Sequence, residues 1–135
     1  MAAHDVVRIV QDIYAAFGRQ DVDAIVNAFA DDAEFHEPPG GEAPFKGTYR
    51  GRDRVRQFLQ GVLDAVDLQT FEPREFFAKG DIVVALGSYR FRSKKTGRSY
   101  ETGWAMVWRF RGDRVGRFDI YKDSATEAAA LRVSS

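Results

Sequence analysis

The feature that most constrains the fold is a change of hydrophobic period at Leu68. From there to residue 122 apolar and polar side chains alternate, as they do in β-strands with one buried face. Two nearly identical Gly-Asp turns, at residues 79–82 and 111–114, interrupt the pattern, and such turns join antiparallel strands in tight hairpins. The second half of the chain is therefore predicted to be a four-strand antiparallel meander, with Pro73 marking an edge or bulged strand.

The first half of the chain has helical periodicity instead. Apolar residues recur at helical spacing in residues 6–17, 22–29 and 55–66, which predicts three helices. Ser124–Glu127 has the form of a capping box and predicts a short Ala-rich C-terminal helix. Together these elements predict one α+β domain over residues 1–135, in which a strongly curved, mostly antiparallel sheet wraps around three N-terminal helices as a cone.

One short strand is expected before the meander, at residues 33–37, where Pro38 and the residues after it end the extended pattern. His36 and Glu37 are adjacent there, and successive strand residues point to opposite faces, so only one of them can enter a given cavity. A carboxylate in an apolar enclosure has its pKa raised towards the range of a general base. Which of the two enters the cavity is left open by the pattern: Glu37 would be a base there, and His36 is either the cavity residue in its place or a hydrogen-bonding partner of a loop.

Composition excludes several classes of function. The 135 residues carry a formal net charge of zero, which gives no basis for binding nucleic acid or a membrane surface. There is no cysteine, hence no disulfide and no thiolate ligand. His4 and His36 are the two histidines, so neither a metal site nor another cofactor is predicted. No membrane span or signal peptide is recognisable, and a cytoplasmic location is expected.

Four stretches carry a resemblance to a known family: Asp21–Ile25, Phe29–Ala33, Pro38–Gly40 and Lys46–Asp53. With them the chain resembles the SnoaL-like group of the nuclear transport factor 2-like superfamily, over almost its whole length. The resemblance implies a cone-shaped fold with a cavity for a small, largely apolar molecule. The superfamily includes polyketide cyclases, ketosteroid isomerases, epoxide hydrolases and non-catalytic binding domains, so the fold alone does not select an activity.

The resemblance also suggests site residues. Glu37 is similar in position to the aspartate base of ketosteroid isomerases, and Asp119 to the final-strand aspartate of polyketide cyclases and epoxide hydrolases. The two oxyanion donors of ketosteroid isomerases would fall on Ile13 and near Met106, which carry no such groups, so steroid isomerisation is not predicted. Asp119 has a second interpretation, as an outer-face ion pair with Arg117.

The function expected from these residues is cofactor-free acid–base chemistry on the bound molecule: isomerisation, aldol-type cyclisation, or hydration and hydrolysis. Glu37 would be the base, Asp119 its partner, and His36 a third catalytic candidate. The expected ligand-binding residues are Tyr14, Phe58, Trp104, Met106, Trp108 and Tyr121. The alternative is a non-catalytic ligand-binding or dimerisation module of the same fold.

The convex face of the sheet is expected to form a homodimer. The outward residues of 82–92 and 99–111 include Val84, Leu86 and Val107, and apolar side chains in the middle of such a face are unfavourable in water.

Overall fold

The computed structural model describes residues 3–133, with side chains from residue 5 onwards, and confirms the α+β fold. Its elements, in chain order, are α1 (Ala3–Gly18), α2 (Val22–Asn27), β1 (Phe29–His36), β2 (Thr48–Arg50), α3 (Arg52–Ala65), β3 (Val66–Lys79), β4 (Ile82–Ser93), β5 (Ser99–Arg111), β6 (Arg114–Lys122) and α4 (Ser124–Leu131). The short strand β2 has no counterpart in the sequence prediction. Among the described residues, no helix is long and apolar enough to cross a membrane.

The six strands form one curved sheet in the order β2-β1-β6-β5-β4-β3. The predicted meander is confirmed, since β3 to β6 pair antiparallel in sequence order, whereas β1 pairs parallel with β6. Gly80 and Gly112 occupy the two hairpin turns with φ of 59° and 62°, a conformation that glycine adopts without steric cost. β3 is an edge strand with a register shift between Pro73 and Glu75, as the proline predicted.

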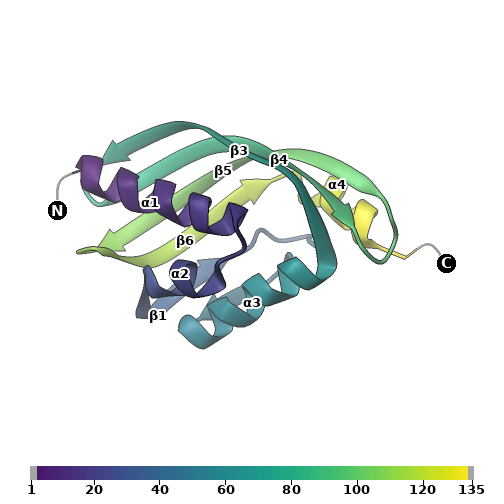
Figure 1. Ribbon diagram of the computed structural model, residues 1–135, viewed down its shortest axis with the longest axis horizontal. Coiled ribbons are helices and arrows are strands. Elements are labelled where there is room, and N and C mark those ends of the chain that lie inside the picture. Colours follow the sequence, from purple (N-terminus) through teal and green to yellow (C-terminus); the bar gives the residue numbers. More distant parts are fainter. Residues whose placement is uncertain (1–2, 134–135) are drawn as a thin grey trace.

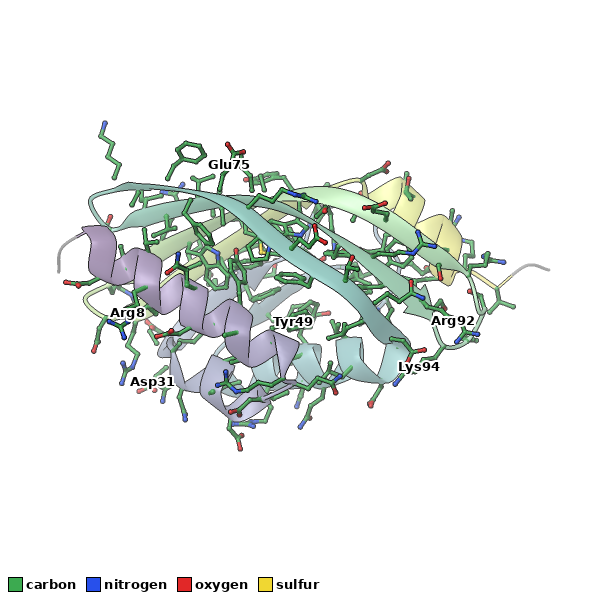
Figure 2. All side chains as sticks on the ribbon, turned by 45° about the horizontal axis from the view of Figure 1, so that its top comes forward. Arg8, Asp31, Tyr49, Glu75, Arg92 and Lys94 are labelled. Atoms are coloured by element: carbon green, nitrogen blue, oxygen red, sulfur yellow. The ribbon has the colours of Figure 1, made fainter. Side chains whose placement is uncertain are left out.

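The three N-terminal helices cover the concave face of the sheet, while α4 lies at the far end of the long strands (Figure 1). The buried core lies between these layers and is rich in aromatic rings. Charged side chains such as Arg8, Asp31 and Lys94 lie at the periphery (Figure 2). Helix α1 packs on β3 and β4, and helix α3 packs on β1, β2 and β3, so the candidate site lies between these helices and the inner face of the sheet.

The C-terminal helix begins differently from the prediction. Its N-cap is Asp123, whose Oδ1 accepts a hydrogen bond from the backbone N–H of Thr126 at 3.0 Å. The predicted capping box is therefore wrong, because Glu127 does not fold back on the helix start. Glu127 is instead fully buried in the interior.

Candidate functional site

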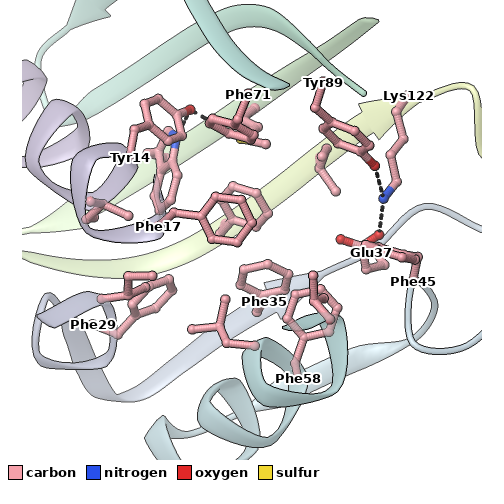
Figure 3. Close-up of a pocket in the computed structure, with 18 of the residues that line it drawn as sticks. Tyr14, Phe17, Phe29, Phe35, Glu37, Phe45, Phe58, Phe71, Tyr89 and Lys122 are labelled. Atoms are coloured by element: carbon pink, nitrogen blue, oxygen red, sulfur yellow. Dashed lines mark hydrogen bonds and ion pairs between the residues drawn. The ribbon is translucent and has the colours of Figure 1, made fainter. Parts of the chain in front are cut away.

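The helices and the inner face of the sheet enclose a cavity of about 80 Å³ (Figure 3). Aromatic rings form much of its wall: Phe29, Phe35, Phe45, Phe58, Phe71 and Phe118. An apolar cavity of roughly 150 Å³ holds a benzene ring. The cavity therefore accommodates a few non-hydrogen atoms as it stands, and a larger ligand requires its side chains to move.

Strand β1 directs Glu37 into this cavity. Ala33 and Phe35 are buried on the inner face, and Glu37 continues their alternation beyond the end of the strand. The backbone N–H of Glu37 donates to the carbonyl of Gly47 at 3.0 Å, which fixes the chain where it leaves the sheet. Of the two adjacent candidates, Glu37 lines the cavity and His36 does not.

Lys122, on β6, forms an ion pair with Glu37 at one end of the cavity. Its Nζ lies 2.7 Å from Oε1 of Glu37 and 2.6 Å from Oε1 of Glu127. The same ammonium donates to the hydroxyl of Tyr89 at 3.1 Å and lies 4.4 Å from the ring centroid of Phe45. All three charged side chains are at most 2% exposed, so this cluster is shielded from solvent.

Helix α4 supplies Glu127 to this cluster from the other side. The hydroxyls of Tyr89 and Tyr100 both donate to its Oε2, the latter at 2.6 Å. Lys122 forms an ion pair with the other oxygen of Glu127, Oε1, which accepts no hydrogen bond of good geometry from the described residues. We refer to Glu37, Lys122, Glu127, Tyr89 and Tyr100 as the inner cluster.

Burial dominates the electrostatics of Glu37. Loss of hydration raises its pKa from 4.5 to about 7, although the attraction and hydrogen bonding of Lys122 act in the opposite direction. Repulsion from Glu127 adds a smaller upward contribution. Glu37 can therefore take up and release a proton near neutral pH.

Tyr14 places a second polar group in the wall of the cavity, away from Glu37 (Figure 3). Its hydroxyl accepts a hydrogen bond from Nε1 of Trp108 at 3.0 Å and donates to Sδ of Met106 at 3.2 Å. Burial raises the pKa of Tyr14, so it is a neutral donor. Because a thioether is a weak acceptor, the Tyr14 proton is available to a stronger acceptor on a ligand.

The other expected ligand-binding residues of the core divide into two groups. Phe58, Met106 and Trp108 line the cavity, together with Tyr14. Trp104 is buried on the same face of β5 but packs behind the wall, with its ring centroid 5.4 Å from that of Phe71. The inward orientation of these β5 side chains agrees with the sequence prediction.

His36 belongs to a second charged cluster, on the outer face of the sheet. Its Nε2 lies 3.2 Å from Oε2 of Glu34, and its Nδ1 lies 3.1 Å from the hydroxyl of Thr48. Glu34 also pairs with Arg50 at 3.0 Å and with Arg117 at 3.7 Å. His36 therefore hydrogen-bonds its own and a neighbouring strand and faces away from the cavity, so of the two roles considered for it the hydrogen-bonding one agrees with the structure and the catalytic one does not.

Asp119 and Tyr121 also lie on the outer face, so their expected placement in the cavity is wrong. Asp119 pairs with Nε of Arg117 at 2.9 Å, and Tyr121 is 60% exposed. The physical reason is a bulge: between the pairs Arg109–Arg117 and 110–115, β6 contains one residue more than β5. That residue shifts the alternation, and the inward residues of β6 beyond it are 118, 120 and 122. We refer to Glu34, His36, Arg50, Arg117 and Asp119 as the outer cluster.

Two charged residues of the inner cluster were missed by the sequence analysis. Lys122 shares the inner face with Phe118 and Ile120, and alternation from these two would have placed it inside. Glu127 shares a helix face with Leu131, four residues further on. The sequence spacing of both residues therefore pointed to the interior. They were missed because lysine and glutamate are usually exposed, so a charged residue in an apolar pattern is ordinarily assigned to the surface.

The described part of the chain contains no group of three or more histidine and acidic residues placed to hold a metal ion. The side chain of His4 lies outside the described residues. A ligand in the cavity therefore contacts the acid–base groups of Glu37, Lys122 and Tyr14 and the aromatic side chains of its wall.

Comparison with known proteins relates this geometry to a family. The family model described as the SnoaL-like domain matches residues 10–118. A solved NTF2-like protein from Burkholderia xenovorans is 33% identical, with a TM-score of 0.88 over 98% of this chain and 99% of that chain. The uncharacterized protein Rv0034 of Mycobacterium tuberculosis is 29% identical over 123 residues, 89% of this chain and 92% of its own. TerC, co-crystallised with polyporic acid, has a TM-score of 0.82 at 24% identity and covers 94% of this chain and 98% of its own.

Proposed function

Since the chain belongs to the SnoaL-like domain family, we propose that its cavity binds a small, largely apolar molecule and that Glu37 acts on it as a general base, without a cofactor. The observation that carries the proposal is a solvent-shielded carboxylate at the end of an aromatic cavity. Its pKa of about 7 matches the requirement of a base that works near neutral pH. TerC, which shares the fold, was crystallised with a small molecule, polyporic acid.

The reaction that suits this geometry is proton abstraction next to a carbonyl group, the step common to isomerisation and aldol-type cyclisation. Glu37 would take the proton at one end of the ligand. The hydroxyl of Tyr14 would turn from Met106 to the carbonyl oxygen and stabilise the negative charge that develops there. Water addition, with Glu37 activating the water, uses the same base. Asp119 has no part in the proposal, because it lies on the opposite face of the sheet.

The test begins with a thermal-shift screen of small carbonyl compounds, because a ligand that binds only the folded state raises the melting temperature. Exchange of the hydrogen next to the carbonyl with solvent deuterium then reports base catalysis by NMR. We expect Glu37→Gln to slow this exchange by roughly 10²–10⁴-fold, and the outer-face variant Asp119→Asn to leave it unchanged. Exchange that survives Glu37→Gln would overturn the role of Glu37, and binding without exchange would support the non-catalytic module instead.

We further propose that two copies pair through the outer face of the sheet. Val84 lies opposite Val107 there and Leu86 opposite Ala105, all half-buried, and Phe77 beside them is 55% exposed. Pairing would bury on the order of 1,500 Å². Sedimentation should give a dimer at tens of micromolar, and a monomer at that concentration would contradict the interface. A cytoplasmic location stays a prediction of the sequence.

A further inference from the structure

The ammonium of Lys122 is already surrounded by three oxygen atoms of the protein. An ammonium carries three N–H donors. Glu37, Glu127 and Tyr89 each provide an acceptor within 3.1 Å of Nζ. An anionic ligand therefore cannot use Lys122 without breaking one of these buried contacts.

The carboxylate of Glu37, by contrast, can still accept a hydrogen bond. Lys122 pairs with its Oε1 at 2.7 Å as an ion pair, and among the described residues no hydrogen bond of good geometry reaches either oxygen of Glu37. The side chain is 2% exposed and lines the cavity, so water from the surface does not supply the missing partner freely. A ligand that enters the cavity meets an unpartnered carboxylate oxygen.

The inner cluster is also unbalanced in charge. Two carboxylates and one ammonium sum to −1 when all are ionised. The other titratable groups that interact electrostatically with Glu37 are the phenols of Tyr49, Tyr89 and Tyr100. Burial raises the pKa of each phenol, so all three are neutral. The neighbouring His36 faces outwards, where it pairs with Glu34. A buried net charge is costly, and either a proton or a cation at Glu37 removes it.

We propose that the ligand of this cavity is a small amine, bound as its ammonium ion with an N–H donating to Oε2 of Glu37; this assignment of ligand class rests on the proposed function. The aromatic walls suit a cation as well as an apolar body, as the ammonium of Lys122 over Phe45 already demonstrates. The volume of about 80 Å³ limits the ligand to a few non-hydrogen atoms.

Three probes with the same four-carbon body test the charge requirement: n-butylamine, 1-butanol and butyrate. Each is titrated into the ¹⁵N-labelled protein at about pH 8, where Glu37 is ionised and the amine is protonated. We expect the amine to bind at least about tenfold more tightly than the alcohol, as is typical of a hydrogen bond between charged groups. Butyrate should bind more weakly than the alcohol, and the shifted resonances should be those of cavity residues.

Glu37→Gln and pH provide two independent controls. In Glu37→Gln the preference for the amine should vanish, while the alcohol should bind within about threefold of its original affinity, since the cavity keeps its shape. In the wild type, lowering the pH from about 8 to about 6 protonates Glu37 and should weaken the amine about tenfold but leave the alcohol unchanged. The outer-face variant Asp119→Asn should behave as the wild type throughout.

The outcomes separate the two proposals. Binding in the cavity without preference for the amine, or with preference for butyrate, would overturn the ligand class and leave the binding function intact. An amine preference that persists in Glu37→Gln would overturn the ligand class as well, because the ammonium would then lie elsewhere. If none of the three probes binds, the amine proposal is overturned, and the thermal-shift screen of carbonyl compounds then decides separately whether the cavity binds small molecules.

Discussion

The inner and outer clusters lie on opposite faces of the sheet, and β6 contributes side chains to both. His36 and Glu37 are neighbours in sequence, and one joins the outer cluster while the other joins the inner one. The charged side chains of the inner cluster are at most 2% exposed, whereas those of the outer cluster range from 14% to 74%. Similar ion pairs thus form on both faces, and the two clusters differ in how far their charged groups are exposed to solvent. On the outer face water screens each pair, but on the inner face every unpaired charge has a large energetic cost.

Lys122→Met should produce the largest contrast between the clusters. It leaves two buried carboxylates, Glu37 and Glu127, without their cation, and we expect a loss of about 3–5 kcal/mol in the free energy of unfolding at neutral pH. The matched outer-face variant, Arg117→Met, should cost less than about 1 kcal/mol because its pairs are solvated. Urea unfolding of both variants measures the difference, and equal losses would contradict the comparison.

Glu37→Gln should have the next largest effect, on the pH dependence of stability. In the wild type, the pKa of Glu37 is about 7 in the folded state and 4.5 in the unfolded state. Between these pH values Glu37 is therefore more protonated in the folded state than in the unfolded state. The stability of the wild type therefore falls as the pH rises through this window, by up to about 3 kcal/mol at 1.36 kcal/mol per pKa unit. The variant should lack this contribution and be at least as stable at neutral pH, since it leaves one ammonium facing one carboxylate.

Urea unfolding at several pH values between about 4 and 8 gives both curves. His36→Ala is the control: its effect through Glu34 is confined to pH values near and below about 4.5, and the fall in stability between about pH 5 and 7 should remain because Glu37 keeps its burial and its contact with Lys122. Parallel curves for the wild type and Glu37→Gln would mean that Glu37 titrates normally.

His36→Ala itself should have the smallest effect, confined to the outer cluster. The hydrogen bond with His36 is the main cause that lowers the pKa of Glu34 below its ordinary value. Removing the imidazole should let the Glu34 pKa rise towards 4.5, while ligand binding and the pKa of Glu37 stay unchanged. NMR titration of the side-chain carboxyl carbons detects the shift, and an effect on ligand binding would show that the two faces are coupled.

The fold was predictable because its signals are local. The Gly-Asp turns, the period-two alternation and Pro73 each act over a few residues, and the structure confirms the meander and the edge strand that they predict. Alternation over the short strand predicted that His36 and Glu37 face opposite ways, and the resemblance to the family favoured Glu37 as the inward residue, which is the orientation seen in the structure.

The composition of the site was less predictable because it depends on tertiary contacts. One extra residue in β6 turns Asp119 outwards and Lys122 inwards, and the sequence does not mark where strand pairing accommodates it. Glu127 becomes an interior residue only because α4 docks against β5 and brings it to Tyr89 and Tyr100. The position of the bulge and the docking of α4 are both set by tertiary contacts, and the partner of Glu37 was therefore assigned to Asp119 instead of Lys122.

The central claim, that the carboxyl group of Glu37 exchanges its proton near neutral pH inside the cavity, is tested most directly by its own titration. Carboxyl carbon NMR of the labelled protein, assigned with Glu37→Gln, should show one glutamate resonance that titrates at about pH 7 and disappears in the variant. A ligand that donates a hydrogen bond to Glu37 as a cation should move this midpoint downwards. If the Glu37 resonance titrates near its ordinary value of 4.5, the carboxylate is not the shielded proton acceptor that the account requires.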